Sequence, residues 1–165
     1  MAVALNSISQ DDRIDYSKLS VIVGQLGGPA GDDIERQLSI LGITNPLISH
    51  DADRIRRGIE VDHPDLMLCT VAAGREQAHD LMRGVRHQEI GSNPFVVMIA
   101  VGHHAAPSDV ARTTDSGTDE IIAAPFSRDL FVMRLNELAR NRKKFVATTN
   151  FVGPTRRSSA RPRRA

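Results

Sequence analysis

The sequence predicts an α/β fold in which a parallel five-stranded sheet lies between two layers of helices. Five short runs of apolar or β-branched residues alternate with five segments whose apolar residues recur at helical spacing. Two of the runs, Leu66–Val71 and Phe95–Val101, are apolar at nearly every position and therefore on both faces, which is typical of central strands covered by helices. The 165 residues, 41% of them apolar, suffice for one sizeable core. These observations favour a flavodoxin-like, doubly wound sheet in the order 2-1-3-4-5, followed by a basic C-terminal tail.

The first strand follows a polar N-terminal segment. Residues 1–17 show no sustained period and are expected to form a flexible leader. Ser20–Val23 is a β-branched run that predicts the first strand. Asp32 or Asp33 is expected to cap the helix that follows, because an aspartate oxygen can accept from the free N–H groups of the first turn. Gly42 is expected to end this helix.

The middle of the chain repeats the alternation of strand and helix. Pro46–Ser49 predicts the second strand, and Asp51 is expected to begin the second helix. Leu66–Val71 predicts the third strand. Apolar residues spaced three and four apart between Ala78 and Val85 predict the third helix.

The last third of the chain completes the sheet. Phe95–Val101 is the most apolar run and predicts the fourth strand. Pro107 is expected to lie in the first turn of a fourth helix, where its missing N–H has no cost. Ile121–Ala124 predicts the fifth strand, and Ser127 is expected to cap a final helix.

The charge of the chain is unevenly distributed. Residues 141–165 contain no Asp or Glu and eight basic side chains, namely Arg142, Lys143, Lys144, Arg156, Arg157, Arg161, Arg163 and Arg164. Residues 1–140 carry 20 acidic and 13 basic side chains, a formal charge of −7. Because neutralising phosphates requires clustered Lys and Arg, the acidic body is not expected to bind nucleic acid in general. A polyanion is instead expected to bind to the basic tail.

The cysteine count and the hydropathy indicate the compartment. Cys69 is the single cysteine, so it cannot close an internal disulfide, and its apolar strand predicts a buried, unreactive thiol. No run approaches the length of a membrane span, and the N-terminus lacks the pattern of a signal peptide. We therefore expect a cytoplasmic protein with no membrane span.

Three stretches of the chain resemble the receiver domain of bacterial two-component response regulators. They are Pro64–Val71, Pro94–Ala100 and Ser116–Phe126, which contain the PDLxL strand, the Gly-x-Asp/Glu pair before strand five and the terminal x-P-F in the family's order. The resemblance implies a receiver-like domain over residues 18–142, between the leader at 1–17 and a partly disordered, Arg-rich tail at 143–165. It also implies a role in phosphorelay signalling.

The resemblance locates the family's phosphorylation site in this sequence. In the family, a carboxylate ending strand three accepts phosphate from a histidine kinase, and two acidic residues after strand one hold Mg²⁺. A Thr or Ser ends strand four, and a Lys precedes the proline after strand five. The corresponding positions here are Thr70 for the acceptor, Gly24 and Gln25 for the acidic pair, Ile99 or Ala100 for the hydroxyl, and Ala124 for the Lys.

These replacements remove the chemistry of phosphoryl transfer. The reaction needs an ionised oxygen nucleophile, a hard cation held by carboxylates and a cationic group near the product. Thr70 is not ionised at neutral pH, and Gly24 and Gln25 offer no anionic ligand to Mg²⁺. The chain is therefore expected to be a degenerate receiver that is not an enzyme and that binds neither a metal nor a cofactor.

Two further motifs invite a functional interpretation. The glycine-rich segment Gly24–Gly31 follows a strand, but it lacks the Gly-Lys-Ser/Thr ending of a phosphate-binding loop, which favours a wide turn. His103 and His104 follow strand four, but no third ligand is placed to complete a metal site, which favours a solvated loop.

The tail leaves two interpretations open. It is either a solvated, partly disordered terminus or an anion-binding segment, since arginine forms bidentate hydrogen bonds with phosphates. Its candidate anion-binding residues are Arg156, Arg157, Arg161, Arg163 and Arg164. Receiver-like proteins with arginine-rich ends resemble one group of effectors that bind cyclic diguanylate, although RNA, an anionic membrane or an acidic protein fits the charge equally well. Phe145 and Phe151 are expected to pack against the body of the domain.

The sequence therefore predicts an atypical receiver that signals through protein contacts without aspartate phosphorylation. The resemblance implies that the surface of helix four, strand five and helix five docks signalling proteins or a second copy of the chain, because family members use that face. The alternative is an effector that binds cyclic diguanylate or another polyanion through the Arg-rich tail.

Overall fold

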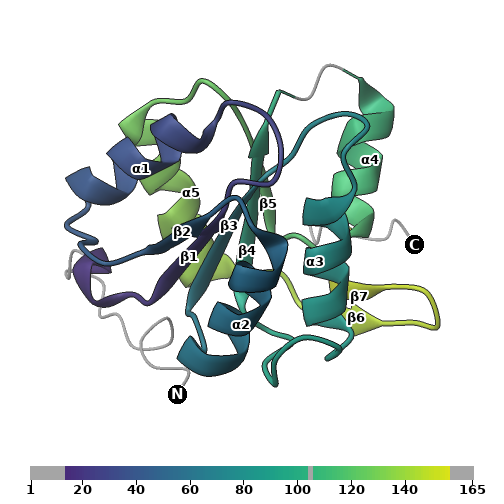
Figure 1. Ribbon diagram of the computed structural model, residues 1–165. Helices are drawn as coiled ribbons and strands as arrows, with labels where there is room; N and C mark the ends of the chain where they lie inside the picture. The colour runs from purple at the N-terminus through teal and green to yellow at the C-terminus, as the bar shows by residue number, and fades with distance from the viewer. Residues whose placement is uncertain (1–13, 104–105, 157–165) are drawn as a thin grey trace, which may run out of the picture.

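The computed structural model describes residues 14–103 and 106–156 (Figure 1). A sheet of five parallel strands runs through the centre in the order β2-β1-β3-β4-β5, which confirms the predicted fold class and strand order. The strands are β1 (Val21–Gly24), β2 (Leu47–Ser49), β3 (Leu66–Thr70), β4 (Val97–Gly102) and β5 (Glu120–Ala123). All five carboxyl ends therefore lie along one edge of the sheet.

Five helices cover the two faces of the sheet. They are α1 (Gly31–Ile40), α2 (Ala52–Asp62), α3 (Gln77–Arg86), α4 (Pro107–Asp115) and α5 (Arg128–Asn141). Helices α1 and α5 lie on one face, and α2, α3 and α4 lie on the other (Figure 1). Neighbouring residues of a strand point to opposite faces, so each strand contributes to two cores. Leu68 of β3 packs with Phe131 of α5 in one core, and Met67 packs with Met82 of α3 in the other.

The helix boundaries follow local capping chemistry. An Asp51 carboxylate oxygen accepts from the Asp53 N–H at 2.9 Å, and the Ser127 hydroxyl accepts from the Leu130 N–H at 3.1 Å, as expected of both caps. Pro107 opens α4, and Gly42 follows α1 with a φ of +78°.

The predicted cap of α1 is wrong. The helix already begins at Gly31, and Ala30 precedes it without a capping side chain. Asp32 and Asp33 lie inside the first turn instead, where their negative charge is favourable because of the helix dipole.

The predicted end of the leader at residue 17 is also wrong. Asp15 caps a short 3-10 helix, η1 (Tyr16–Lys18), and Tyr16 is buried in the core beside α1 and α5. The Tyr16 hydroxyl donates a hydrogen bond to Asn136 of α5, and Ile14 packs against the same core. The folded body therefore includes residues before 18, because an aromatic ring and an isoleucine bury apolar surface there. Residues 1–13 of the expected leader lie outside the described residues.

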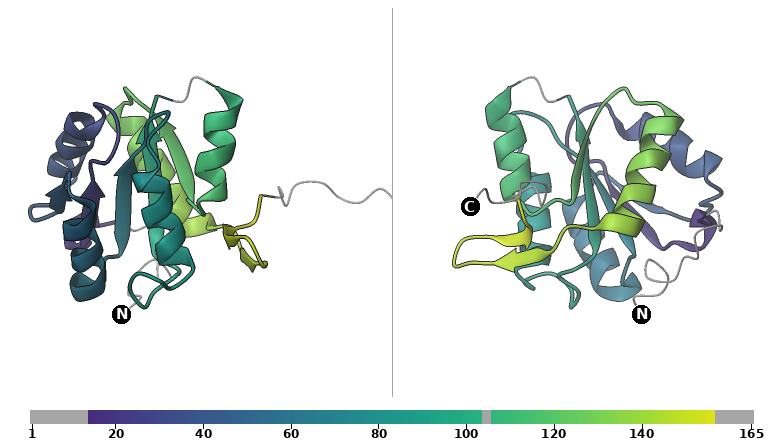
Figure 2. Two further views of the ribbon diagram at one scale, coloured as in Figure 1. Left: turned by 45° about the vertical axis from the view of Figure 1, so that its right-hand side comes forward. Right: turned by 180° about the vertical axis from the view of Figure 1, so that it is seen from behind.

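Residues 143–156 do not form a separate tail. Phe145–Ala147 (β6) and Val152–Pro154 (β7) pair as an antiparallel hairpin that projects from the body at the end opposite the carboxyl edge (Figure 2). Gly153 and Pro154 are buried, because β7 lies against Gly117 and α3. The folded part of the chain therefore extends past the boundary predicted at residue 142 and includes the hairpin. Residues 157–165 lie outside the described part of the chain.

No helix among the described residues is both long and apolar enough to cross a membrane.

Candidate functional site

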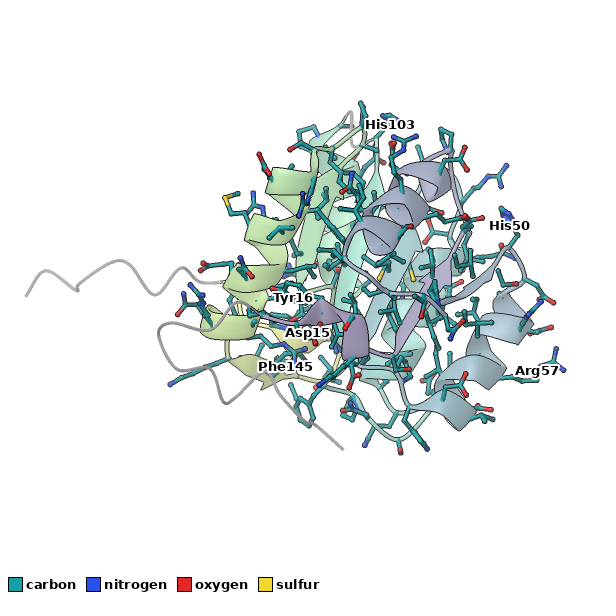
Figure 3. The ribbon with its side chains drawn as sticks, turned by 90° about the vertical axis from the view of Figure 1, so that its left-hand side faces the viewer. Asp15, Tyr16, His50, Arg57, His103 and Phe145 are labelled. Atoms are coloured by element: carbon teal, nitrogen blue, oxygen red, sulfur yellow. The ribbon has the colours of Figure 1, made fainter. Side chains whose placement is uncertain are left out.

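The candidate site lies at the carboxyl edge of the sheet, where doubly wound folds place their ligands. Gly24, Thr70 and Gly102 end three adjacent strands there, and Ala124 follows the end of the fourth. Figure 3 shows His103, which follows β4, and Phe145 at opposite ends of the molecule. The structure thus brings together the positions that the resemblance assigned to β1, β3 and β5.

Thr70 holds the loop after β1 in place. Its side chain is fully buried, and its hydroxyl oxygen accepts from the Gly27 N–H at 3.0 Å. The hydroxyl lies at 3.5 Å from the Gly24 carbonyl, to which it donates. At the position that the resemblance assigns to the phosphoacceptor, the structure therefore has a hydroxyl that satisfies a buried backbone donor.

Backbone fills the space around the end of β3. A Cβ on Gly27 would lie 2.8 Å from the Ala72 nitrogen, and a Cβ on Gly102 would lie 2.3 Å from the Val71 carbonyl oxygen. Gly27 and Gly102 thus lie in close contact with the backbone of Val71 and Ala72, which follow Thr70. No side chain fits at either position without moving that segment.

The hydroxyl position predicted for β4 is wrong. The strand register pairs Ile99 with Leu68 and Ala100 with Cys69, so both residues are buried within the strand, before its end. Thr70 pairs with Val101, and Gly102 ends the strand. The sequence-based prediction placed the position two or three residues too early, because the apolar run does not show where strand β4 ends and the loop begins. Val101 and Gly102, which end the strand, have no hydroxyl side chain either.

Gln25 and Ala124 have structural contacts at this edge. The Gln25 amide donates to a Glu35 carboxylate oxygen at 2.7 Å, and its backbone carbonyl lies 3.1 Å from Nδ1 of His50. Ala124 is buried, and its N–H donates to the Gly102 carbonyl at 3.1 Å. Neither residue supplies a charge to the site.

The residues at this edge do not fit Mg²⁺. Hard cations in proteins require oxygen ligands, with carboxylates foremost, and the strand ends present glycine, an amide, a threonine hydroxyl and alanine. Asp33 of α1 pairs with Arg36 at 3.4 Å. Within residues 14–103 and 106–156, no cluster of three or more His, Cys, Asp or Glu side chains is arranged to hold a metal ion.

A small pocket of about 10 Å³, enough for roughly one water molecule, opens beside this edge, between the loop after β3 and helix α4. Its lining residues are Val71, Ala72, Ala73, His79, His103, Asp109, Arg112 and Thr113. Nε2 of His79 lies 3.1 Å from the Thr113 hydroxyl, whose proton is donated to the Asp109 carbonyl, and Arg112 forms an ion pair with Glu76. These polar groups join α3 to α4. His104 lies outside the described residues.

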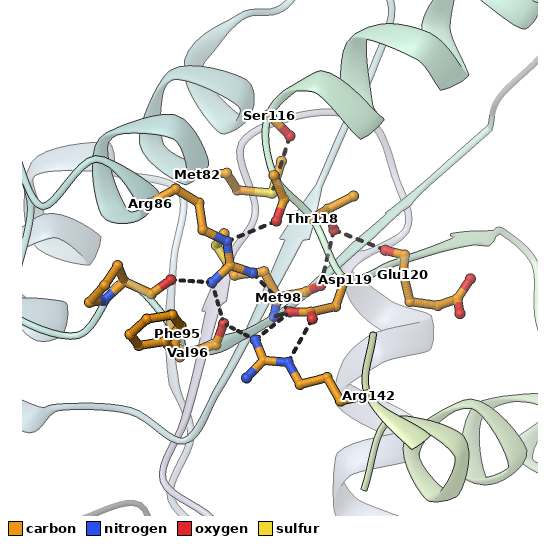
Figure 4. Close-up of polar contacts among 12 residues, drawn as sticks. Met82, Arg86, Phe95, Val96, Met98, Ser116, Thr118, Asp119, Glu120 and Arg142 are labelled. Atoms are coloured by element: carbon orange, nitrogen blue, oxygen red, sulfur yellow. Dashed lines mark hydrogen bonds and ion pairs between the residues drawn. The ribbon is translucent and has the colours of Figure 1, made fainter. Parts of the chain in front are cut away.

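A buried ion cluster lies at the other end of the sheet and is absent from the sequence-based predictions (Figure 4). The Asp119 carboxylate is 1% exposed and accepts from Arg86 at 2.8 Å and from Arg142 at 2.8 and 3.0 Å. Arg86, itself 1% exposed, also donates to the carbonyls of Gly117, Pro94 and Val96. Burial lowers the pKa of Arg86 to about 10 against the raising effect of Asp119, so the guanidinium remains charged at neutral pH.

Phe145 of the hairpin covers this cluster. Its ring centroid lies 4.7 Å from the guanidinium carbon of Arg86 and 4.6 Å from that of Arg142, and it meets the Phe95 ring edge-on at 5.3 Å. Phe145 thus packs against the body as expected. Phe151 instead packs within the hairpin, beside Gly153 and under the Arg156 guanidinium at 4.8 Å.

We expect Cys69 to react slowly with thiol reagents in the folded protein. The side chain is 1% exposed, and burial raises its pKa to about 12. Thiolate is the reactive form, so both access and ionisation are suppressed. The measurement is the rate of labelling by Ellman's reagent, with the unfolded protein in guanidinium as the control. Labelling of the folded protein at the rate of the unfolded chain would contradict the buried strand.

The comparisons with known proteins concern the fold. No family model matches the chain, and no curated protein matches it in sequence. The receiver domain of Francisella response regulator 1452 matches with a TM-score of 0.59 and 18% identity, over 74% of this chain and 97% of that one. HP1043, an orphan response regulator of H. pylori, matches at 0.58 and 15%, over 75% and 98% of the two chains. The chemotaxis protein CheY4 of Vibrio cholerae matches at 0.60 and 13%, over 72% and 97%. The chain therefore has the receiver-domain fold of two-component response regulators.

Proposed function

We propose that the protein is an atypical receiver that signals in the bacterial cytoplasm by protein contacts, without phosphorylation of an aspartate and without enzymatic activity. The observation that carries this proposal is the engagement of the Thr70 hydroxyl with the Gly27 N–H. A receiver is switched by phosphorylation at the end of this strand, whereas here the Thr70 hydroxyl is hydrogen-bonded to the backbone of Gly27 and Gly24. The single cysteine and the lack of a long apolar run support the cytoplasmic location.

The surface of α4, β5 and α5 is the proposed site of partner docking or self-association. β5 is an edge strand of the sheet, so no further strand of the sheet covers its outer side. Val110 of α4 is exposed, Ile121 is half-buried and Ala123 is exposed. Arg134 of α5 lies 3.6 Å from the Glu120 carboxylate across this face. The combination of apolar groups with a solvent-exposed ion pair suits a protein partner.

Acetyl phosphate with Mg²⁺ is expected to leave the protein unmodified, because no ionised nucleophile or metal ligand lies at the strand ends. The measurement is intact-protein mass spectrometry after incubation, with a phosphorylatable receiver as the positive control. A stoichiometric gain of one phosphate that disappears in the Thr70→Val variant would refute the proposal.

Binding of cyclic diguanylate or another polyanion remains the second candidate function. The stretch 141–165 with its eight basic and no acidic residues supports it. Arg156, the one candidate residue within the described range, is exposed but forms an ion pair with Asp115. Calorimetry with cyclic diguanylate on the full chain, and on a variant with Arg156, Arg157, Arg161, Arg163 and Arg164 replaced by glutamine, distinguishes the two functions. Binding by the full chain alone would favour the effector role.

A further inference from the structure

The β6–β7 hairpin leaves one edge of its backbone without partners. Thr148 N–H donates to the Phe151 carbonyl at 2.7 Å, and Thr155 N–H donates to the Lys144 carbonyl at 2.7 Å. Hydrogen-bonded and non-hydrogen-bonded pairs alternate along an antiparallel ladder. The backbone groups of Val146 therefore point toward β7, and those of Phe145 and Ala147 point away from it. Within the described part of the chain, no hydrogen bond engages these outward N–H and C=O groups.

The two edges of the hairpin face different surroundings. The outer edge of β7 lies against the body, because a Cβ on Gly117 would lie 2.6 Å from the Val152 carbonyl oxygen. Pro154 also removes an N–H from that edge. On β6, by contrast, Val146 and Ala147 are exposed. An unpaired edge facing solvent is a template for a further strand.

Exposed apolar side chains lie on both faces of this edge. Val146 is 40% exposed and points away from the Arg86 cluster, since neighbouring strand residues alternate in direction. Phe95 is 57% exposed and touches the ring of Phe145 on the opposite face. A strand added to β6 would therefore find an apolar contact on each of its faces.

The charged residues next to β6 along the chain are all basic. Lys143 and Lys144 precede β6 and are exposed, and residues 141–156 contain no acidic side chain. A second copy of this edge would bring lysines against lysines, which disfavours self-pairing. Acidic side chains on an added strand would complement the lysines.

We propose that the outer edge of β6 binds an extended acidic segment of a partner protein by addition of a β-strand. The outward N–H and C=O groups of Phe145 and Ala147 supply the main-chain hydrogen bonds. Val146 and Phe95 accept apolar side chains of the segment, while Lys143 and Lys144 pair with its carboxylates. The alternation of backbone donors and acceptors favours a peptide over a nucleic acid. The proposed edge consists of residues of β6 and not of the exposed surface of α4, β5 and α5, so peptide binding there is tested separately from docking on that surface.

The test uses the full chain and a short synthetic peptide of alternating glutamate and valine. In NMR titration, the amide signals of Phe145 and Ala147 are expected to shift, and hydrogen exchange at both amides is expected to slow. The Val146 amide already faces β7, so its exchange serves as an internal control. A peptide N-methylated at every backbone nitrogen, and one of alternating lysine and valine, are both expected to bind at least about tenfold more weakly.

The matched variants are Ala147→Pro and Ala147→Ser. Proline removes the outward N–H without removing a hairpin hydrogen bond, and is expected to weaken binding by about tenfold, whereas serine keeps the N–H and is expected to bind normally. Phe95→Ser is expected to weaken binding as well. The proposal is overturned if the N-methylated peptide binds as tightly as the unmodified one, or if the peptide shifts neither the Phe145 nor the Ala147 amide signal. Both results hold even if Ala147→Pro disturbs the hairpin.

Two other occupants are tested in parallel. Binding of oligothymidylate that is tighter than that of the acidic peptide and depends on Phe95 assigns the surface to nucleic acid, and a dimer of the chain that is lost in Ala147→Pro assigns it to a second copy. Either outcome also overturns the proposal.

Discussion

Replacing Asp119 by alanine is expected to lower the free energy of unfolding by about 3–5 kcal/mol, the cost of breaking a buried ion pair from one side. The carboxylate is the shared acceptor of Arg86 and Arg142, and it also accepts from the Met98 N–H at 2.9 Å. Its removal leaves the buried Arg86 guanidinium without a counter-charge beside a second guanidinium. Urea denaturation followed by circular dichroism measures the change.

The control for this prediction is the adjacent carboxylate. Glu120 pairs with Arg134 at 3.6 Å, and 24% and 41% of the two side chains remain exposed. Its replacement by alanine is expected to cost at most about 1 kcal/mol, because solvent screens the pair. Asp119→Asn keeps an oxygen acceptor and is expected to fall between the two. Equal stability of the Asp119→Ala variant and the parent protein would show that the cluster does not hold the fold together.

Ending the chain after Lys144 is expected to lower the free energy of unfolding by about 2–3 kcal/mol, the contribution of a packed phenylalanine and its contacts with two guanidinium groups. The truncation removes the ring that covers Arg86 and Arg142, and it exposes more of Phe95. For a chain of this length the change corresponds to a decrease in Tm of about 5–10 °C. Differential scanning calorimetry measures it.

Two variants separate the hairpin from the charge of the tail. Phe145→Ala is expected to reproduce most of the loss, because it removes the same ring from a full-length chain. Replacing Arg156, Arg157, Arg161, Arg163 and Arg164 by glutamine is expected to change Tm little, since the exposed Arg156 pair contributes at most about 1 kcal/mol. An unchanged melting curve after truncation, with fast amide exchange over residues 145–152, would contradict the docking of the hairpin.

The sheet could be predicted because its signals are local. Runs such as Leu66–Val71 are apolar on both faces, and the residues that begin α2, α4 and α5 act through hydrogen bonds or φ values within one turn. The sequence also located the ends of strands β1 and β3 near Gly24 and Thr70, because the apolar runs stop there, while the loss of the phosphorylation site at Gly24, Gln25, Thr70 and Ala124 stays a prediction. Its β4 member could not, because the register of β4 against β3 depends on contacts between strands rather than on the run itself.

The ion cluster and the hairpin gave weaker signals. Asp119 lies 33 residues after Arg86 and 23 before Arg142, so no window of periodicity contains all three. Arg86 lies four residues after the buried Met82, on a face of α3 that periodicity assigns to apolar residues. The Phe-Val pairs at 145 and 151 indicated packing against the body, but the hairpin was not predicted, because the positive charge of the surrounding residues favoured a solvated tail.

The long sequence separations within the ion cluster have a consequence for synthesis on the ribosome. A nascent chain that has reached β4 has already made Arg86 and two of the carbonyls that bind it, those of Pro94 and Val96, but it lacks the compensating carboxylate. Burying a guanidinium without that partner is unfavourable, so the first four strands have no stable packed form around Arg86 until Asp119 emerges. Arg142 and Phe145 complete the cluster later still. The domain is therefore expected to fold as one cooperative unit after nearly all of it has left the exit tunnel, and not strand by strand as it is translated.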